Sequence, residues 1–145
     1  MALVRWLLNI PKDHPLIKGL EIPQRELDEL WFLRVFTVDF AVFSVFGNTP
    51  VKAAILDAFY DQVEEGIMDP ARYTQLLERL TLYGTAMRQS GTRPGGPVGD
   101  VGSAFARACG VEGLDYAFYG GMEFGTVAKA IKDLLLGWRE KYTIV

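Results

Sequence analysis

Two charged residues interrupt an apolar stretch of the sequence, and they have the clearest potential for chemistry. The stretch runs from Leu30 to Gly47 and contains Arg34 and Asp39. A helix turns by about 100° per residue, so these two side chains point about 140° apart and cannot pair well with each other. Each must therefore find a partner on another part of the fold.

Asp39 falls on the side of this helix that carries several phenylalanines. A carboxylate there needs a donor from outside its own helix, or it takes a raised pKa. Perturbed carboxylates gather at active sites, but structural ion pairs have the same signature. We expect Asp39 to be buried and bound to a backbone donor or an arginine, with Arg79, Arg88 and Arg107 as candidates. A functional acid or base is the alternative.

Arg34 lies on the opposite stripe, together with Thr37, Ala41 and Ser44. Small and hydroxyl-bearing side chains at this spacing allow another helix to approach closely. Arg34 could meet a carboxylate of that helix or an anionic ligand. Close packing is the simpler interpretation of the stripe.

Aromatic and glycine residues gather between positions 116 and 125. Tyrosines and a phenylalanine at 116, 118 and 119 are followed by glycines at 120, 121 and 125. Such a segment could line a pocket for an apolar or planar ligand between helices, or it could pack a chain reversal onto the core. The tentative ligand-binding residues are therefore Arg34, Asp39, Tyr116 and Tyr119.

Metal and covalent chemistry find little support in the residue types. The chain has one histidine, His14, and one cysteine, Cys109. Zinc and di-iron sites need several ligands at fixed spacings, so we expect no metal and no other cofactor, and we assign no catalytic residue. A nucleophilic cysteine needs a nearby base, so Cys109 is expected to be a small buried apolar residue.

Two further patterns have simple interpretations. The acidic residues Asp57, Asp61, Glu64 and Glu65 are typical of a solvated helix face that can serve as an electrostatic docking surface. The run GGPVGDVG at 95–102 follows a predicted helix instead of a strand and lacks a lysine. It therefore does not match a phosphate-binding loop.

The composition bounds the class of protein. A chain of 145 residues fits one domain. A net charge of −3 without a basic cluster argues against nucleic acid. Half of the residues are apolar, so either the core is unusually complete or some apolar surface belongs to a partner or ligand. The lone cysteine indicates a reducing compartment, and we expect a cytoplasmic protein.

Targeting and membrane segments are not expected. The first 15 residues lack the small-residue cleavage site of a signal peptide. The apolar stretch is long enough to attract attention as a membrane span. However, Arg34 and Asp39 near its middle would each cost about 2.5–3.5 kcal/mol on insertion.

Apolar periodicity and turn residues predict helices with short connections. Thr-Pro at 49–50 and Asp-Pro at 69–70 are typical helix starts, and glycines at 47, 66 and 110 are typical helix ends. The expected helices are Ala2–Asn9, Pro23–Phe46, Pro50 to the closing Gly66, Pro70 to about Ser90, Val101–Cys109 and about Met122–Lys141. Gly91–Gly102 is expected to be a loop or linker, and Val111–Gly121 shows no clear period.

These segments predict a single all-α domain over residues 1–145. The stretch 30–47 is apolar around its whole circumference, so other helices must enclose it. We expect a compact helical bundle of about five to six helices around this buried central helix. The connections at 47–49 and 66–69 are short, so the central helix and the next two should be consecutive antiparallel neighbours.

The leading function from sequence is a non-enzymatic protein–protein interaction or regulatory module that associates with itself as a homodimer. The expected interface lies on the N-terminal helix, the last helix or both, because aromatic residues near the chain ends anchor interfaces. The tentative interface residues are Trp6, Leu7, Trp138 and Tyr142. A binder of a small apolar or aromatic ligand within the bundle is the alternative, and an enzyme is third.

Overall fold

The computed structural model describes residues 24–67, 69–90, 96–111 and 114–141, and these residues form five α-helices. In chain order they are α3 (Gln24–Phe46), α4 (Pro50–Ile67), α5 (Pro70–Ser90), α6 (Gly96–Ala108) and α7 (Leu114–Lys141). The all-α helical bundle is therefore confirmed. The predicted helix at 2–9 lies outside the described residues.

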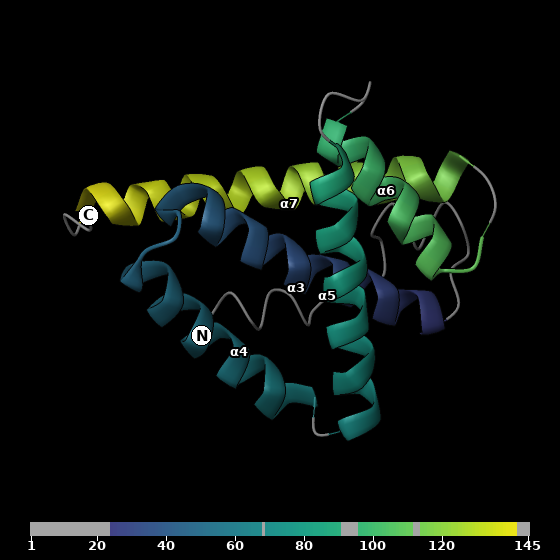
Figure 1. Cartoon of the computed structure of the whole chain (residues 1–145), viewed down its shortest axis with the longest axis horizontal. Coiled ribbons are helices and arrows are strands. Elements are labelled where there is room, and N and C mark those ends of the chain that lie inside the picture. Colours follow the sequence, from purple (N-terminus) through teal and green to yellow (C-terminus); the bar gives the residue numbers. More distant parts are fainter. Residues whose placement is uncertain (1–23, 68, 91–95, 112–113, 142–145) are drawn as a thin grey trace.

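Helix α3 is the central helix of the bundle. It packs against α4, α5, α6 and α7, and it lies between α4 and α7 in Figure 1. All residues from Leu30 to Val38 are buried. A helix that is apolar on every side has no face to offer to water, so neighbours must cover it on every side.

Several helix ends follow the expected local chemistry. The backbone N–H of Lys52 donates to Oγ1 of Thr49 at 3.3 Å, and the N–H of Ala71 donates to Oδ1 of Asp69 at 3.0 Å. Gly47 (φ 63°) follows α3, where a left-handed residue without a Cβ is needed. The prediction for position 66 is wrong in detail, because α4 continues through it to Ile67.

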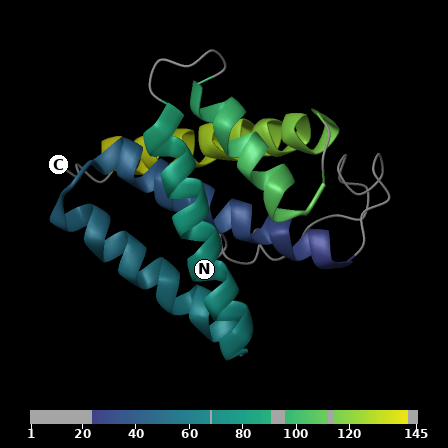
Figure 2. The same ribbon diagram turned by 45° about the vertical axis from the view of Figure 1, so that its right-hand side comes forward.

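The three helices α3, α4 and α5 contact one another, but they are not a simple antiparallel set. Helices α3 and α4 run in opposite directions and diverge from their connection, whereas α5 crosses α3 steeply (Figures 1 and 2). The core accordingly has two parts. One joins α3, α4, the C-terminal half of α7 and Leu76 of α5, and the other joins α3, α5, α6 and the N-terminal half of α7.

The glycine-rich segment before position 102 differs from its prediction. Residues 91–95 lie outside the described residues, but α6 already begins at Gly96. Proline at position 97 suits the first helical turn, where its missing N–H would have no partner. The expected loop therefore contributes a full turn of helix, and Asp100 lies inside α6 instead of capping it.

Helix α7 also begins earlier than expected, at position 114 instead of about 122. Its glycines at 120 and 121 lie where α6 crosses it. A Cβ at Gly102 of α6 would lie 2.2 Å from the carbonyl oxygen of Ala117, and a Cβ at Gly120 would lie 2.7 Å from the Phe105 ring. Each helical glycine costs about 1 kcal/mol of helix propensity, and the close packing of α6 on α7 offsets that cost.

Candidate functional site

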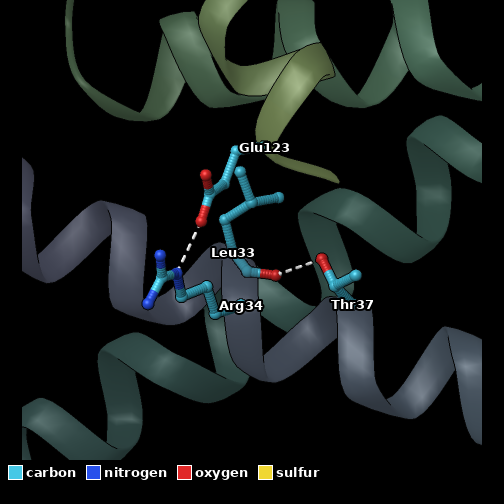
Figure 3. A network of polar contacts seen from close by, with 4 residues as sticks. All are labelled: Leu33, Arg34, Thr37 and Glu123. Carbon is cyan, nitrogen blue, oxygen red and sulfur yellow. Dashed lines mark hydrogen bonds and ion pairs between the residues drawn. The ribbon is translucent and has the colours of Figure 1, made fainter. Parts of the chain in front are cut away.

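Arg34 binds a carboxylate of α7, one of the two partners expected for it. Its Nε lies 2.5 Å from Oε1 of Glu123, and the two side chains are only 6% and 10% exposed. Figure 3 shows this pair between α3 and α7, beside Thr37, whose hydroxyl donates to the Leu33 carbonyl at 2.8 Å. Arg34, Thr37 and Ala41 are thus part of a packed helix contact, whereas Ser44 at the end of the stripe is exposed.

Asp39 has a different partner from the one expected. The hydroxyl of Tyr60 on α4 donates a hydrogen bond to Oδ2 of Asp39. Asp39 is partly exposed instead of buried. Burial and then the neighbouring Asp39 charge raise the pKa of Tyr60, so the phenol stays a donor.

A second ion pair, which sequence reasoning missed, joins α3 to α5. Nε and Nη2 of Arg79 each lie 2.7 Å from a carboxylate oxygen of Glu29. This hydrogen bonding raises the pKa of Arg79 above its usual value. Glu29 and Arg34 are five positions apart, so they point about 140° from each other on α3. The same helical geometry used for Asp39 could have indicated two partners on different helices.

Tyr83 lies beside this second pair and is fully buried. Burial, followed by the Glu29 charge, raises its pKa well above the usual value. Its hydroxyl has no hydrogen-bond partner within the described residues. Together the two ion pairs fix α5 and α7 on opposite sides of α3, which is an architectural role for the charged residues of the interior.

The aromatic residues expected to line a pocket mainly fill the core. The Tyr116 ring stacks on Phe105, with centroids 6.4 Å apart, and Tyr119 packs against the same cluster. This arrangement favours the packing interpretation for both tyrosines. Phe118 between them is different, because 64% of its surface is exposed.

Exposed apolar side chains concentrate on α7. Nine large hydrophobic residues are exposed in the described part of the chain, and six of them belong to this helix. Four of the six share one side of α7 with a glycine and two lysines, within about 80° around the axis. We call this stripe the outer face of α7, which comprises Leu114, Phe118, Met122, Gly125, Lys129, Lys132 and Leu136.

A groove of about 420 Å³ opens along the C-terminal half of this outer face. Its apolar walls come from three helices, with Phe40 of α3, Val98 of α6 and Leu136 of α7 among them. Nζ of Lys132 lies 4.6 Å from the centroid of the Phe40 ring. The groove therefore combines an apolar floor with a charged rim of Lys129, Lys132 and Asp133, in which Lys129 pairs with Asp133. None of the four candidate ligand-binding residues lines it.

The expected interface residues are placed only in part. Trp138 lies near the C-terminal end of α7 and is 39% exposed. Leu134, one turn earlier, is exposed as well. Trp6, Leu7 and Tyr142 lie outside the described residues, as does His14.

The remaining polar residues show no metal centre. No group of three or more histidine, cysteine and acidic side chains comes together in the described ranges. The acidic residues at 57, 61, 64 and 65 are exposed, and Cys109 is buried, both as expected. None of the described helices combines the length and hydropathy needed to cross a bilayer.

The geometry of the outer face of α7 and its groove is the feature with the most evident capacity to bind. Comparison with models of protein families, with curated proteins and with solved structures gives no match for this chain. Function is therefore inferred from its own side chains.

Proposed function

We propose that this chain is a non-enzymatic protein-interaction module and that the outer face of α7 is its binding surface. The observation that supports this most directly is the clustering of exposed apolar side chains on that one helix. Single exposed apolar residues are normal on a monomer, but contiguous apolar patches mark interaction sites.

The composition of the patch supports the same proposal. Leu114, Phe118 and Met122 are spaced by four residues and form a continuous stripe over about two turns. Val98 of α6, which is 45% exposed, extends the patch sideways because it lies against Gly121. Phenylalanine and methionine are enriched in protein interfaces.

The polar groups support a binding role over catalysis. The buried acids Glu29 and Glu123 are each bound to an arginine, and the raised pKa values of Tyr60 and Tyr83 keep both phenols protonated. The net charge of −3 favours a protein over a nucleic acid as partner, and the single cysteine fits a cytoplasmic location.

Site-specific photo-crosslinking tests the proposal. A photoreactive phenylalanine analogue at position 118 should give a protein adduct on irradiation in the native cells, because this ring lies in the proposed interface. The same analogue at Ala54, an exposed position on α4, is the control and should give none. No adduct from position 118, or equal adducts from both positions, would refute the binding surface.

The groove supports a second candidate function, the binding of a small apolar molecule with an anionic group. Such a molecule would place its apolar part on Phe40 and Val98 and its charge near Lys132. Native mass spectrometry should then show a small-molecule adduct on the wild-type protein that is absent from Val98→Asp. A wild-type protein without an adduct would refute this candidate.

A further inference from the structure

We propose that the partner is a second copy of this chain, which pairs antiparallel along the outer face of α7 about a two-fold axis near Gly125. This inference rests on the proposed function and names the partner. It is carried by a protruding side chain and a groove that lie on the same side of the same helix, too far apart to meet within one molecule.

Phe118 is the protruding side chain. It is 64% exposed, with Leu114 and Met122 one turn away on either side. The groove begins at Gly125 and extends past Lys132 to Leu136. Phe118 and Lys132 are 14 residues apart, or about 21 Å along the axis, so the ring cannot reach the middle of the groove in its own chain.

An antiparallel two-fold axis at Gly125 brings the two features together. Such an axis places each residue opposite the one equally far on the other side of position 125. Phe118 of one copy then faces Lys132 of the other, and Leu114 faces Leu136. The ring enters an apolar groove with an ammonium at its rim, a combination that gives both burial and a cation–π contact. Both pairings occur twice by symmetry.

Glycine at the crossing point favours this register over others. Gly125 carries no side chain, so the two α7 helices can approach closely there. Val98 lies next to this glycine, 3.9 Å from the place of a Cβ, and is itself 45% exposed. It therefore lies beside the axis, where it can pack against the other copy.

The size of the surface predicts a dimer of modest affinity. From Leu114 to Leu136 the outer face is about 33 Å long, and only Val98 and Phe40 widen it noticeably. A standard interface buries about 800 Å² per partner, and a narrow helical strip falls at or below that value. We therefore expect an equilibrium between monomer and dimer that depends on protein concentration.

Sedimentation equilibrium of the full chain over a wide concentration range tests the inference. The wild-type protein should move from the 16.2 kDa monomer mass towards twice that mass as concentration rises. Phe118→Ser should raise the dissociation constant by about 30-fold or more, as for an aromatic residue central to an interface. Leu77→Ser on α5, which removes a comparably exposed apolar side chain, is the matched control and should leave the dissociation constant unchanged.

A single cysteine tests the register. Gly125→Cys should form a disulfide-linked dimer under mild oxidation, because a residue on the axis lies next to its own copy. Ala54→Cys should form no disulfide-linked dimer under the same conditions, because Ala54 lies on α4, away from the proposed axis. A dimer that persists in Phe118→Ser, or a Gly125→Cys protein that does not cross-link, would refute the antiparallel arrangement.

The outcomes separate this inference from the proposed function. A monomer at every concentration, combined with a photo-crosslink from position 118 to a different protein, would overturn the second copy and leave the interaction module. A monomer without any crosslink would overturn both. Because Phe118 is exposed in the monomer, its substitution should not change the urea midpoint at a protein concentration where the wild type is monomeric, and that measurement shows that the variants are folded.

Discussion

Removal of Glu123 should strongly destabilise this protein, because it leaves the guanidinium of Arg34 buried without its carboxylate. The two side chains are 6% and 10% exposed and their nearest charged atoms are 2.5 Å apart. Removing one partner of a buried ion pair costs roughly 3–5 kcal/mol, since the remaining charge stays out of water and loses a close opposite charge. We therefore expect Glu123→Leu to lower the free energy of unfolding by about that amount.

The matching double substitution should cost much less. Replacing both charges with apolar side chains of similar size removes the desolvation penalty together with the attraction, and such replacements are often neutral. Arg34→Met combined with Glu123→Leu should lie within about 1 kcal/mol of the wild type. The double variant should therefore be more stable than either single variant.

Urea unfolding measures both effects. With a slope of about 2 kcal/mol per M, Glu123→Leu should lower the midpoint by about 1.5–2.5 M. Asp133→Asn is the control, because Asp133 forms an exposed ion pair with Lys129, with side chains 62% and 79% exposed. It should change the free energy by less than about 0.5 kcal/mol.

Two results would refute this reasoning about the buried pair. The first is a loss below about 1 kcal/mol in Glu123→Leu, which would mean that water or other contacts of Arg34 stabilise its charge without Glu123. The second is a double variant as unstable as the sum of the two single variants, which would mean that the pair is not energetically coupled.

Three further predictions concern tyrosines and glycines. Tyr60→Phe should lower the free energy of unfolding by about 1–2 kcal/mol, because it removes a hydrogen bond to a carboxylate. Tyr83→Phe should raise the free energy of unfolding by about 1 kcal/mol, because it removes a buried hydroxyl that has no partner in the described chain. A reversed order of the two urea midpoints would contradict these hydrogen-bond assignments. The pKa values of both phenols are raised in the folded state, so the folded protein keeps protons that unfolded tyrosines lose near pH 10. The free energy of unfolding should therefore be unaffected by these groups below about pH 10 and should fall as the pH rises above it. Equal urea midpoints at pH 8 and pH 11 would exclude this linkage. Gly102→Ala should lower the free energy of unfolding by about 1–3 kcal/mol, because its Cβ would meet a backbone carbonyl of α7. Gly137→Ala, which has open space around it, should raise the free energy of unfolding by about 0.5–1 kcal/mol. Thermal or urea unfolding measures both changes. Equal effects would show that α6 does not pack closely there.

The sequence by itself was sufficient for the fold class and for several helix ends. Leu30 to Val38 are apolar on every side, which required an enclosed helix. Thr49, Asp69 and Gly47 act through hydrogen bonds and backbone angles within a few residues. These features depend on local chemistry, and local chemistry can be recognised without knowledge of the fold.

The early start of α7 could not be found in this way. Glycines at 120 and 121 are typical of a break, yet they lie inside the helix because α6 needs their small size. Helix propensity measures the isolated chain, whereas the packing of α6 on α7 adds a favourable energy that only the folded chain supplies.

The partners of the charged residues were also decided by tertiary structure. Helical geometry showed that Arg34 and Asp39 need separate partners, but it could not identify them. Glu123 is 89 positions from Arg34, so only the fold brings the two together. The direction of α4 likewise brings Tyr60 to Asp39. The candidate interface on α7 was also decided by tertiary structure. Periodicity identifies the apolar residues of α7, but it cannot tell which of them other helices cover. Phe118 stays exposed while its neighbours at 116 and 119 pack into the core, because α6 and α3 approach the helix from the other sides.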